Sequence, residues 1–274
     1  MKKIAVVGMG IIGGSICGAL TKAGYIVDGF SRGESSLDYA LKKGYIQNKG
    51  ANLADYDVVF IAVPVKATLD YLSNANFKDN ALVMDICGIK TAVEEIVYQK
   101  ERNYRYVGLH PMAGKETSGI ESASPDLFHK ANLIITISDK TNAKDLAEAK
   151  EYAQAMRFGR IVECTAQEHD AKIALTSQLA HIVSNAYVKS EQVSKCEGFT
   201  GGSFQDMTRI AGVDEKMWTE LYMYNRPFIL KELEGLMAHL NVYKEALAEN
   251  NAEALSDALK EGRLIRENIK RGND

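Results

Sequence analysis

Two residues far apart in the chain have side chains suited to acid–base and carboxylate-binding chemistry. His110 follows the apolar stretch Tyr106-Val-Gly-Leu109. Because the carboxyl ends of strands in an open α/β sheet face the ligand crevice, His110 is a candidate general base, although a lone histidine is more often structural. Arg209 follows a turn, Gly201-Gly202, that leads into a short helix. Its guanidinium suits a substrate carboxylate, with an ordinary surface charge as the alternative.

A second group of polar side chains follows helical spacing. Glu168-His-Asp170 and Ser177-Gln-Leu-Ala-His181 fall in one predicted helix, Glu168 to Glu191. Asp170, Ser177 and His181 lie near one helix face by the i, i+3, i+4 rule. That face indicates either part of a substrate pocket or a hydrogen-bonded seam between two domains.

A glycine-rich turn near the N-terminus predicts a dinucleotide site. Gly8-Met-Gly10-Ile-Ile12-Gly13 comes directly after an apolar strand and opens a helix. In this arrangement glycines permit a tight turn and close approach to a pyrophosphate, while free N–H groups at the helix N-terminus face the phosphates. We therefore expect Gly8, Gly10, Ile12 and Gly13 to contact a dinucleotide, with a purely structural turn as the alternative.

The tip of the second predicted strand favours NADP as the cofactor, with NAD possible. NAD enzymes usually place an acidic residue there to accept a hydrogen bond from the ribose. Here the tip reads Phe30-Ser31-Arg32, and Asp28 lies inside the strand. A hydroxyl and a guanidinium suit a 2'-phosphate, although Arg32 can instead stack on the adenine or be a solvated loop charge.

The elements that must position these residues alternate between strands and helices up to about residue 163. This alternation is typical of βαβ units with a mainly parallel sheet, so we predict an α/β chain with an N-terminal Rossmann-type doubly wound domain over residues 1–163. The predicted strands are Ile4 to Val7, Tyr25 to Phe30, Val58 to Val63, Ala81 to Asp85, Arg105 to Leu109, Leu133 to Thr136 and Arg160 to Glu163. The irregular interval His110 to Ala131 is long for a loop, and such loops are often functional.

An all-helical C-terminal domain is predicted for residues 164–274, for substrate binding and dimerisation. Thr165 and Glu168 form a capping box, which marks the start of its first helix. A second long helix, Phe228 to Asn250, has apolar residues at alternating steps of four and three, as in a coiled coil. This seam predicts a homodimer through the C-terminal helices: Ile229, Leu233, Leu236, Leu240, Tyr243 and Leu247.

Composition limits the partners. The chain has 274 residues and a net charge of -3, which predicts no attraction to nucleic acid. The four cysteines are too widely spaced to indicate a disulfide framework or a metal site. No apolar stretch is long enough for a membrane span, and no cleavage pattern follows the N-terminal apolar run. We therefore expect a cytoplasmic protein that binds a small molecule.

Together these motifs resemble the prephenate dehydrogenase family, which includes the arogenate and cyclohexadienyl dehydrogenases of tyrosine biosynthesis. The resemblance spans nearly the whole chain. It is carried by the glycine-rich turn, Ala62-Val63-Pro64, Asp85-x-x-Gly88-x-Lys90, His110-Pro-Met-Ala-Gly-x-Glu116-x-Ser-Gly119, Glu168-His-Asp170, Gly-Gly-x-Phe-x-Asp206-x-Thr-Arg209-Ile-Ala, Met217-Trp218 and Asn225.

The resemblance implies NAD(P)-dependent oxidative decarboxylation of prephenate or arogenate. It makes His110 the catalytic base and Arg209 the ligand of the ring carboxylate. Ser177 and His181 then line the substrate pocket; Gln178 occupies a position where the family pattern has histidine, and Glu116 approaches the substrate side chain. Val63, Pro64 and Gly88 lie beside the cofactor in this reading.

One departure from the family pattern affects the base. Relatives often have a serine at the position of Gly88, hydrogen-bonded to the catalytic histidine, whereas this chain reads Asp85-Ile-Cys-Gly88-Ile-Lys90. We expect either a water or the neighbouring backbone to orient His110 instead.

Two other functions are weighed against this one. A β-hydroxyacid dehydrogenase would need Lys followed four residues later by Asn on the first helix after the Rossmann domain, but Lys172 is followed by Thr176. A non-catalytic dinucleotide sensor would not need convergent histidine and arginine side chains. We also expect neither a fused chorismate mutase nor an appended ACT domain.

Overall fold

An eight-stranded sheet organises the N-terminal part of the chain. The computed structural model describes residues 2–114 and 117–271. Its strand order is β3-β2-β1-β4-β5-β6-β7-β8, and neighbouring strands are parallel except β6 and β7. The strands are β1 Ile4–Val7, β2 Val27–Phe30, β3 Asn48–Lys49, β4 Val58–Ile61, β5 Leu82–Asp85, β6 Arg105–Met112, β7 Asn132–Thr136 and β8 Arg160–Cys164.

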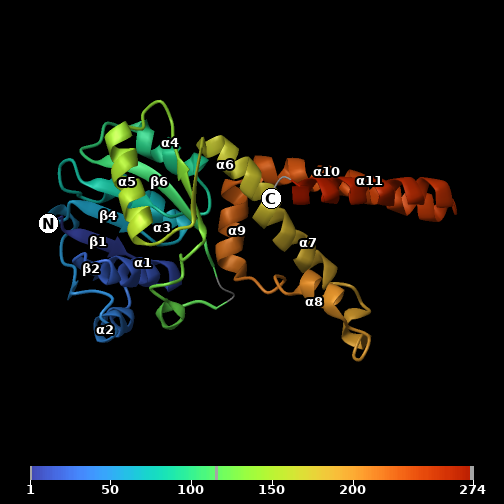
Figure 1. Cartoon of the computed structure of the whole chain (residues 1–274), viewed down its shortest axis with the longest axis horizontal. Helices are drawn as coiled ribbons and strands as arrows, with labels where there is room; N and C mark the ends of the chain where they lie inside the picture. Colours follow the sequence, from blue (N-terminus) through green and yellow to red (C-terminus); the bar gives the residue numbers. More distant parts are fainter. Residues whose placement is uncertain (1, 115–116, 272–274) are drawn as a thin grey trace. The chain divides into compact units, whose positions relative to one another are not determined.

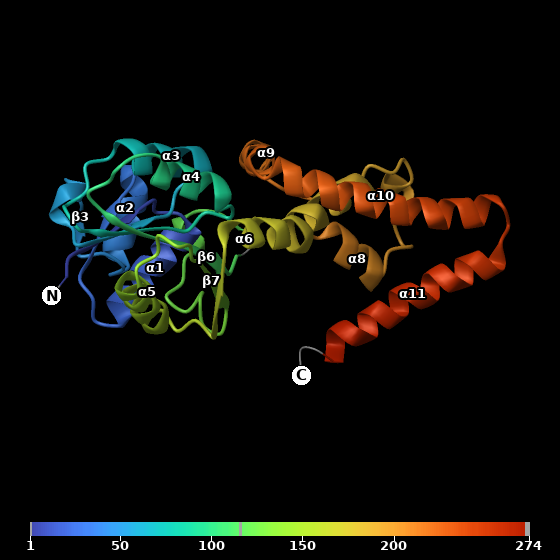
Figure 2. The same cartoon turned by 90° about the horizontal axis from the view of Figure 1, so that it is seen from above.

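Helices cover both faces of this sheet (Figure 1). They are α1 Ile11–Lys22, α2 Glu34–Lys42, α3 Val65–Asn74, α4 Thr91–Gln99 and α5 Ala143–Ala155. Side chains alternate along each strand, so Val58 and Phe60 pack toward α1, α2 and α5, while Val59 and Ile61 pack toward α3 and α4. Figure 2 shows α3 and α4 on one side and α1 and α5 on the other. The predicted doubly wound fold is confirmed.

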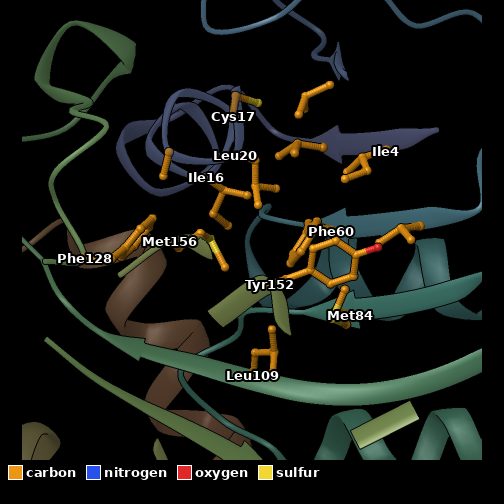
Figure 3. Packing of buried hydrophobic residues seen from close by; sticks show 14 of the residues in the cluster. Ile4, Ile16, Cys17, Leu20, Phe60, Met84, Leu109, Phe128, Tyr152 and Met156 are labelled. Atoms are coloured by element: carbon orange, nitrogen blue, oxygen red, sulfur yellow. The ribbon is translucent and has the colours of Figure 1, made fainter. Parts of the chain in front are cut away.

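The core under α1 and α5 consists of large, fully buried side chains. Figure 3 shows Ile16, Leu20, Phe60 and Tyr152 meeting between these helices and the sheet. The rings of Phe60 and Tyr152 meet edge to face, with centroids 5.8 Å apart. Burial of this surface, at roughly 25 cal/mol per Å² of apolar area, holds the strand ends that carry the functional residues.

Strand β6 extends further than predicted. We expected it to end at Leu109, but the strand continues to Met112. Its last residues pair with the antiparallel strand β7, with His110 opposite Ile134 and Pro111 opposite Leu133. His110 therefore lies within a strand rather than in a loop after it.

The helices that follow the sheet divide differently from the prediction. The region predicted as one helix from Glu168 is α6 Ala166–Ile173, a π-helical segment Ala174–Leu179 and α7 Ala180–Tyr187. The predicted capping box of Thr165 and Glu168 is present. After them come α8 Gly202–Thr208 and α9 Glu215–Tyr224.

The last two helices form a separate compact unit, residues 226–274, after a first unit of residues 1–225. They are α10 Arg226–Ala248 and α11 Ala252–Arg271, joined by a short turn (Figure 2). On α10, the Tyr243 hydroxyl donates to the Ala258 carbonyl of α11, whereas Leu240 and Leu247 are 56% and 65% exposed. Among the described residues, no helix is both long and apolar enough to cross a membrane.

Candidate active site

The glycine-rich turn has the geometry of a phosphate cradle. Gly8 has φ +101°, and a Cβ added there would lie 2.2 Å from the Ala62 carbonyl oxygen. A Cβ at Gly13 would lie 1.8 Å from the Gly8 carbonyl oxygen, so α1 can lie this close to the turn only because residue 13 has no side chain. A Cβ at Gly10 would meet no atom within 4 Å, and Gly10 is the N-cap of α1. The open space at the helix N-terminus fits a pyrophosphate.

A pocket of about 550 Å³ continues from this turn along the carboxyl edge of the sheet. Six residues expected at the cofactor line it: Gly8, Gly10, Ser31, Arg32, Val63 and Pro64. The switch in strand order between β1 and β4 lies at this edge, where doubly wound sheets bind nucleotides. Of the other expected residues, Gly13 packs against Gly8, Ile12 lies in the first turn of α1, and Gly88 follows β5.

Within β2, the carboxylate of Asp28 is engaged by two side chains of the protein. The Asp28 carboxylate accepts hydrogen bonds from the Tyr56 hydroxyl at 2.8 Å and from the Asn48 side chain at 3.0 Å. The Ser31 hydroxyl accepts from the Gly33 N–H, and Arg32 is exposed at the pocket. The polar side chains of β2's carboxyl end that line the pocket are therefore the Ser31 hydroxyl and the Arg32 guanidinium.

His110 belongs to a hydrogen-bonded chain of three side chains. Its Nδ1 lies 2.8 Å from Nε2 of His169, and Nδ1 of His169 lies 2.7 Å from Oδ1 of Asp170. Asp170 also accepts the backbone N–H groups of Lys90 and Thr91, both at 2.8 Å. These two N–H groups begin α4, so the carboxylate sits at the positive end of that helix. We call His110, His169 and Asp170 the relay.

The order of partners in the relay determines the histidine tautomers. An ionised carboxylate only accepts hydrogen bonds, so His169 donates from Nδ1 and has a lone pair at Nε2. Nδ1 of His110 must then donate to His169. The lone pair of neutral His110 is therefore at Nε2, and this is the nitrogen that can accept a proton.

The surroundings favour the neutral form of both histidines. Burial, followed by the charges of His169 and Lys90, holds the pKa of His110 well below its usual value. Burial also lowers the pKa of His169, against the hydrogen bond to Asp170. For Asp170, burial alone would raise the pKa, but hydrogen bonds from His169 and Thr91 lower it overall. At neutral pH the relay consists of two neutral imidazoles and one carboxylate.

Gly88 lies next to the reactive nitrogen of His110. A Cβ at Gly88 would be 3.7 Å from His110 Nε2 and 3.6 Å from Leu221 Cδ2, both ordinary contacts. We expected a water or the backbone to orient His110 in place of the family serine. On the opposite nitrogen, Nδ1, the ring is oriented by the His169 side chain.

Asp170, Ser177 and His181 were predicted on one face of a regular helix from Glu168 to Glu191, and the structure divides this helix. Asp170 is turned to α4, and Gln178 is buried, with its Oε1 accepting from Asn225 at 2.5 Å. The prediction assumed 3.6 residues per turn, and the π-helical segment 174–179 breaks this periodicity. His181 Nδ1 lies 2.9 Å from the Ser177 carbonyl, so these two residues remain one turn apart on the same side of the helix.

Two aromatic side chains of α9 lie at His181. The rings of Trp218 and His181 are 4.0 Å apart between centroids, and Tyr222 lies edge-on to Trp218 at 5.5 Å. Burial raises the pKa of Tyr222 to about 12. One turn along the helix, Leu221 faces Gly88, and Glu220 accepts the backbone N–H of Lys66 at the start of α3. Helix α9 thus contacts both the cofactor side and the His181 side of the site.

Arg209 lies at the end of α8, beside the second half of α7. The Ser184 hydroxyl donates to the Met207 carbonyl, and the Asn185 amide donates to the Ala211 carbonyl. Ser184 is three positions after His181, so these contacts place the end of α8 beside the helix turn that follows His181. Glu116 lies outside the described residues.

Sequence reasoning missed three residues of the site. His169, Trp218 and Asn225 were noted only as parts of motifs. Asn225 donates to the Asp170 carbonyl and to Gln178, which joins α6, the π-helical segment and the end of α9. The available signal for His169 was a histidine beside an aspartate at the start of the helical domain.

The alternatives to this site are a lysine-based dehydrogenase site and a metal site. The Thr176 hydroxyl donates to the Lys172 main-chain carbonyl of its own helix. No cluster of three or more metal-binding side chains occurs within the described ranges.

Two family profiles match the chain. The profile described as "Prephenate dehydrogenase, nucleotide-binding domain" covers residues 16–162, and "Prephenate dehydrogenase, dimerization domain" covers residues 165–261. The curated prephenate dehydrogenase of Lactococcus lactis subsp. cremoris (strain MG1363) is 29% identical over 284 residues, which is 97% of this chain and 77% of that protein.

Solved structures agree with the profiles. Prephenate dehydrogenase from A. aeolicus, in complex with hydroxyphenyl propionate and NAD+, is 28% identical with a TM-score of 0.84 and covers 98% of both chains. Synechocystis arogenate dehydrogenase is 25% identical with a TM-score of 0.81 and covers 97% of this chain and 99% of that one.

Proposed function

Because the chain belongs to the prephenate dehydrogenase family, we propose that the relay supplies the base for its reaction, with His110 Nε2 as the accepting atom. The chain is an NAD(P)-dependent dehydrogenase that carries out oxidative decarboxylation of prephenate or arogenate in tyrosine biosynthesis. The observation that carries the proposal is the position of His110: its reactive nitrogen faces Gly88, at the carboxyl edge that also holds the dinucleotide pocket.

The chemistry required of the protein is proton transfer and orientation. A bound nicotinamide accepts the hydride from the ring carbon that bears the hydroxyl. His110 Nε2 accepts the hydroxyl proton, and the electrons of the breaking bond to carbon dioxide complete the aromatic ring. The phenol product again carries an O–H, so His110 can return its proton to the same oxygen. This fits a relay whose second histidine, His169, is only 1% exposed.

The direct test is the absorbance at 340 nm after the purified protein is mixed with prephenate or arogenate and with NADP or NAD. We expect reduced cofactor to form with at least one of the two substrates. Absence of reduced cofactor with all four combinations, in protein that binds the dinucleotide, would contradict the proposal. Steady-state constants from the same assay rank the two substrates.

NADP is the proposed cofactor, on the strength of Ser31 and Arg32 at the pocket and the engagement of Asp28 by Tyr56. Replacing Arg32 by alanine should weaken NADP binding about 10- to 100-fold, because charge-assisted hydrogen bonds contribute about 1.5–3 kcal/mol. NAD binding should change less than threefold. Dissociation constants from the quenching of Trp218 fluorescence measure both.

Two outcomes of that titration count against NADP. One is a wild-type protein that binds NAD more tightly than NADP. The other is an equal loss for both dinucleotides in Arg32→Ala, which would mean that Arg32 stacks on the adenine. Lys43→Ala provides a control that removes a positive charge elsewhere on the surface.

Arg209 is the proposed ligand of a substrate carboxylate, with Glu116, Ser177 and His181 as further pocket residues. Arg209→Gln should raise KM for the substrate about 10- to 100-fold with a smaller change in kcat, since the lost interaction is present in the bound substrate as well as in the transition state. Arg209→Lys tests the paired geometry, because lysine keeps the charge but not the planar fork. An unchanged KM in both variants would remove Arg209 from the site.

A homodimer is the proposed assembly. The match of residues 165–261 to a dimerization domain supports it, as do the exposed apolar side chains of α10 and α11. They include Met237, Leu240, Leu247, Leu259 and Ile265, each more than half exposed. Exposing so many large apolar side chains to water is unfavourable, which favours their burial against another copy.

A further inference from the structure

Lys90 is a fully buried lysine close to the relay. Its side chain is 0% exposed, and its Nζ lies 2.6 Å from Oδ2 of Asp85, which is also fully buried. Asp85 accepts further hydrogen bonds from the Tyr106 hydroxyl at 2.6 Å and the Cys87 N–H at 2.8 Å. A buried ion pair of this kind is often no more stable than a pair of apolar residues, so stability alone does not explain it.

The fold places this cation under His110. Tyr106, Gly108 and His110 are every second residue of β6 and therefore lie on the same face of the strand. Gly108, in the middle, has no side chain. A Cβ at Gly108 would lie 3.4 Å from Lys90 Cδ and 2.9 Å from the Tyr106 hydroxyl. The lysine therefore crosses β6 in the space that Gly108 leaves, two residues before the base.

The backbone of the same residue holds the other end of the relay. The Lys90 N–H donates to Asp170 Oδ1, the atom that also contacts His169. Lys90 is thus linked to the relay twice, through its main chain to the carboxylate and through its charge to the histidines.

We propose that Lys90 is a positioning residue that keeps the His110–His169 pair unprotonated in the free enzyme, so that His110 is ready to accept the substrate proton. The inference rests on His110 being the base. A nearby cation opposes a second positive charge, and this effect is strong where water is excluded. It also favours the return of the proton to the product oxygen, which regenerates the base.

Other charged groups around His110 act in the same space. His169 and Asp170 face it from α6, Lys90 and Glu94 belong to α4, and Asp85 and Tyr106 lie on β5 and β6. Asp85 opposes Lys90 at His169, but Lys90 has the larger influence there and also lowers the pKa of His110. Removal of the cation should therefore raise the pKa of both histidines.

The test is the pH profile of kcat/KM in Lys90→Met. Because the base must be unprotonated, activity is lost as pH falls through the pKa of the free enzyme, and we expect this midpoint to rise by about one pH unit. At pH values below both midpoints kcat/KM then falls about tenfold further, whereas the plateau at high pH changes much less. Lys78→Met, which removes a surface charge paired with Asp57, should leave the midpoint unchanged.

Two further measurements keep the test decisive. If Lys90→Met does not fold, Asp85→Asn with Lys90→Met replaces the buried ion pair by neutral side chains and should show a smaller rise, because Asp85 opposes Lys90 at His169. Nitrogen-15 spectra of the labelled histidines give the His110 titration without activity. A folded variant with an unchanged His110 titration overturns the inference. A shifted titration with an unchanged kcat/KM profile supports the effect of Lys90 on the histidines but contradicts the proposed function of His110 as the base, on which the inference rests.

Discussion

Replacement of His110 by asparagine should lower kcat about 10²- to 10⁴-fold and leave the dissociation constant of NADP unchanged. Asparagine has a similar size and still donates toward His169, but it has no lone pair of imidazole basicity facing Gly88. His110 does not line the dinucleotide pocket, so cofactor binding should persist. Stopped-flow absorbance at 340 nm and a fluorescence titration measure the two quantities on the same preparation.

The matched control for this variant is His129→Asn. His129 is exposed and contacts Arg157 at a distance from the relay, so its replacement should leave kcat within twofold. Near-normal turnover in His110→Asn, with cofactor binding intact, would rule out His110 as the base. Loss of cofactor binding together with turnover would indicate a structural role instead.

Replacement of Asp170 by asparagine should lower kcat by about 10³- to 10⁴-fold, through the tautomers of the relay. In the Ser-His-Asp triad, the corresponding change from aspartate to asparagine costs about 10⁴ in kcat by placing the imidazole in the wrong tautomer. Here the amide can donate to His169 Nδ1, which shifts the proton of His169 to Nε2. His110 then accepts at Nδ1, and the lone pair is lost from the nitrogen that faces Gly88.

The same substitution should also reduce stability, by about 1–3 kcal/mol, because the amide presents a donor to one of the two N–H groups at the start of α4. The pKa of Asp170 is lowered in the folded protein, so its contribution is present above the unfolded pKa and is lost as pH falls through the folded value. The difference in Tm between wild type and Asp170→Asn should therefore be largest near neutral pH and shrink in acid.

Separating these two effects requires kcat measured well below the Tm of the variant. Asp126→Asn, which removes an exposed carboxylate paired with Lys22, is the control and should retain activity. His169→Asn should lower kcat to a similar degree, and its combination with Asp170→Asn should add little, since the relay acts as a unit. A folded Asp170→Asn protein with wild-type kcat would refute the relay.

Much of the fold was predictable because its signals are local. Gly8, Gly10 and Gly13 lie within six residues, and together with the strand before them and the helix after them they indicate a dinucleotide site. The capping box of Thr165 and Glu168 is likewise complete within one turn of chain. Alternation of short apolar strands with helices predicted the doubly wound sheet for the same reason.

Errors arose where pairing partners lie far away in the chain. Pro111 is typical of a strand end, but β7 pairs with the strand beyond that point. The common face predicted for Asp170, Ser177 and His181 assumed a regular helix, and the π-helical segment alters it. The extension of β6 has no local signal, because it depends on pairing with β7.

The sequence by itself determined the type of protein: a dinucleotide turn, a histidine at a strand end and motifs that resemble one enzyme family. Only the tertiary structure decided which groups control the base. His169 is 59 positions from His110, and Asp170 is 80 positions from the Lys90 N–H that it accepts. Hydrogen bonds and charges act over a few ångströms of space, whatever the separation along the chain, so these partners become visible only when the chain is folded.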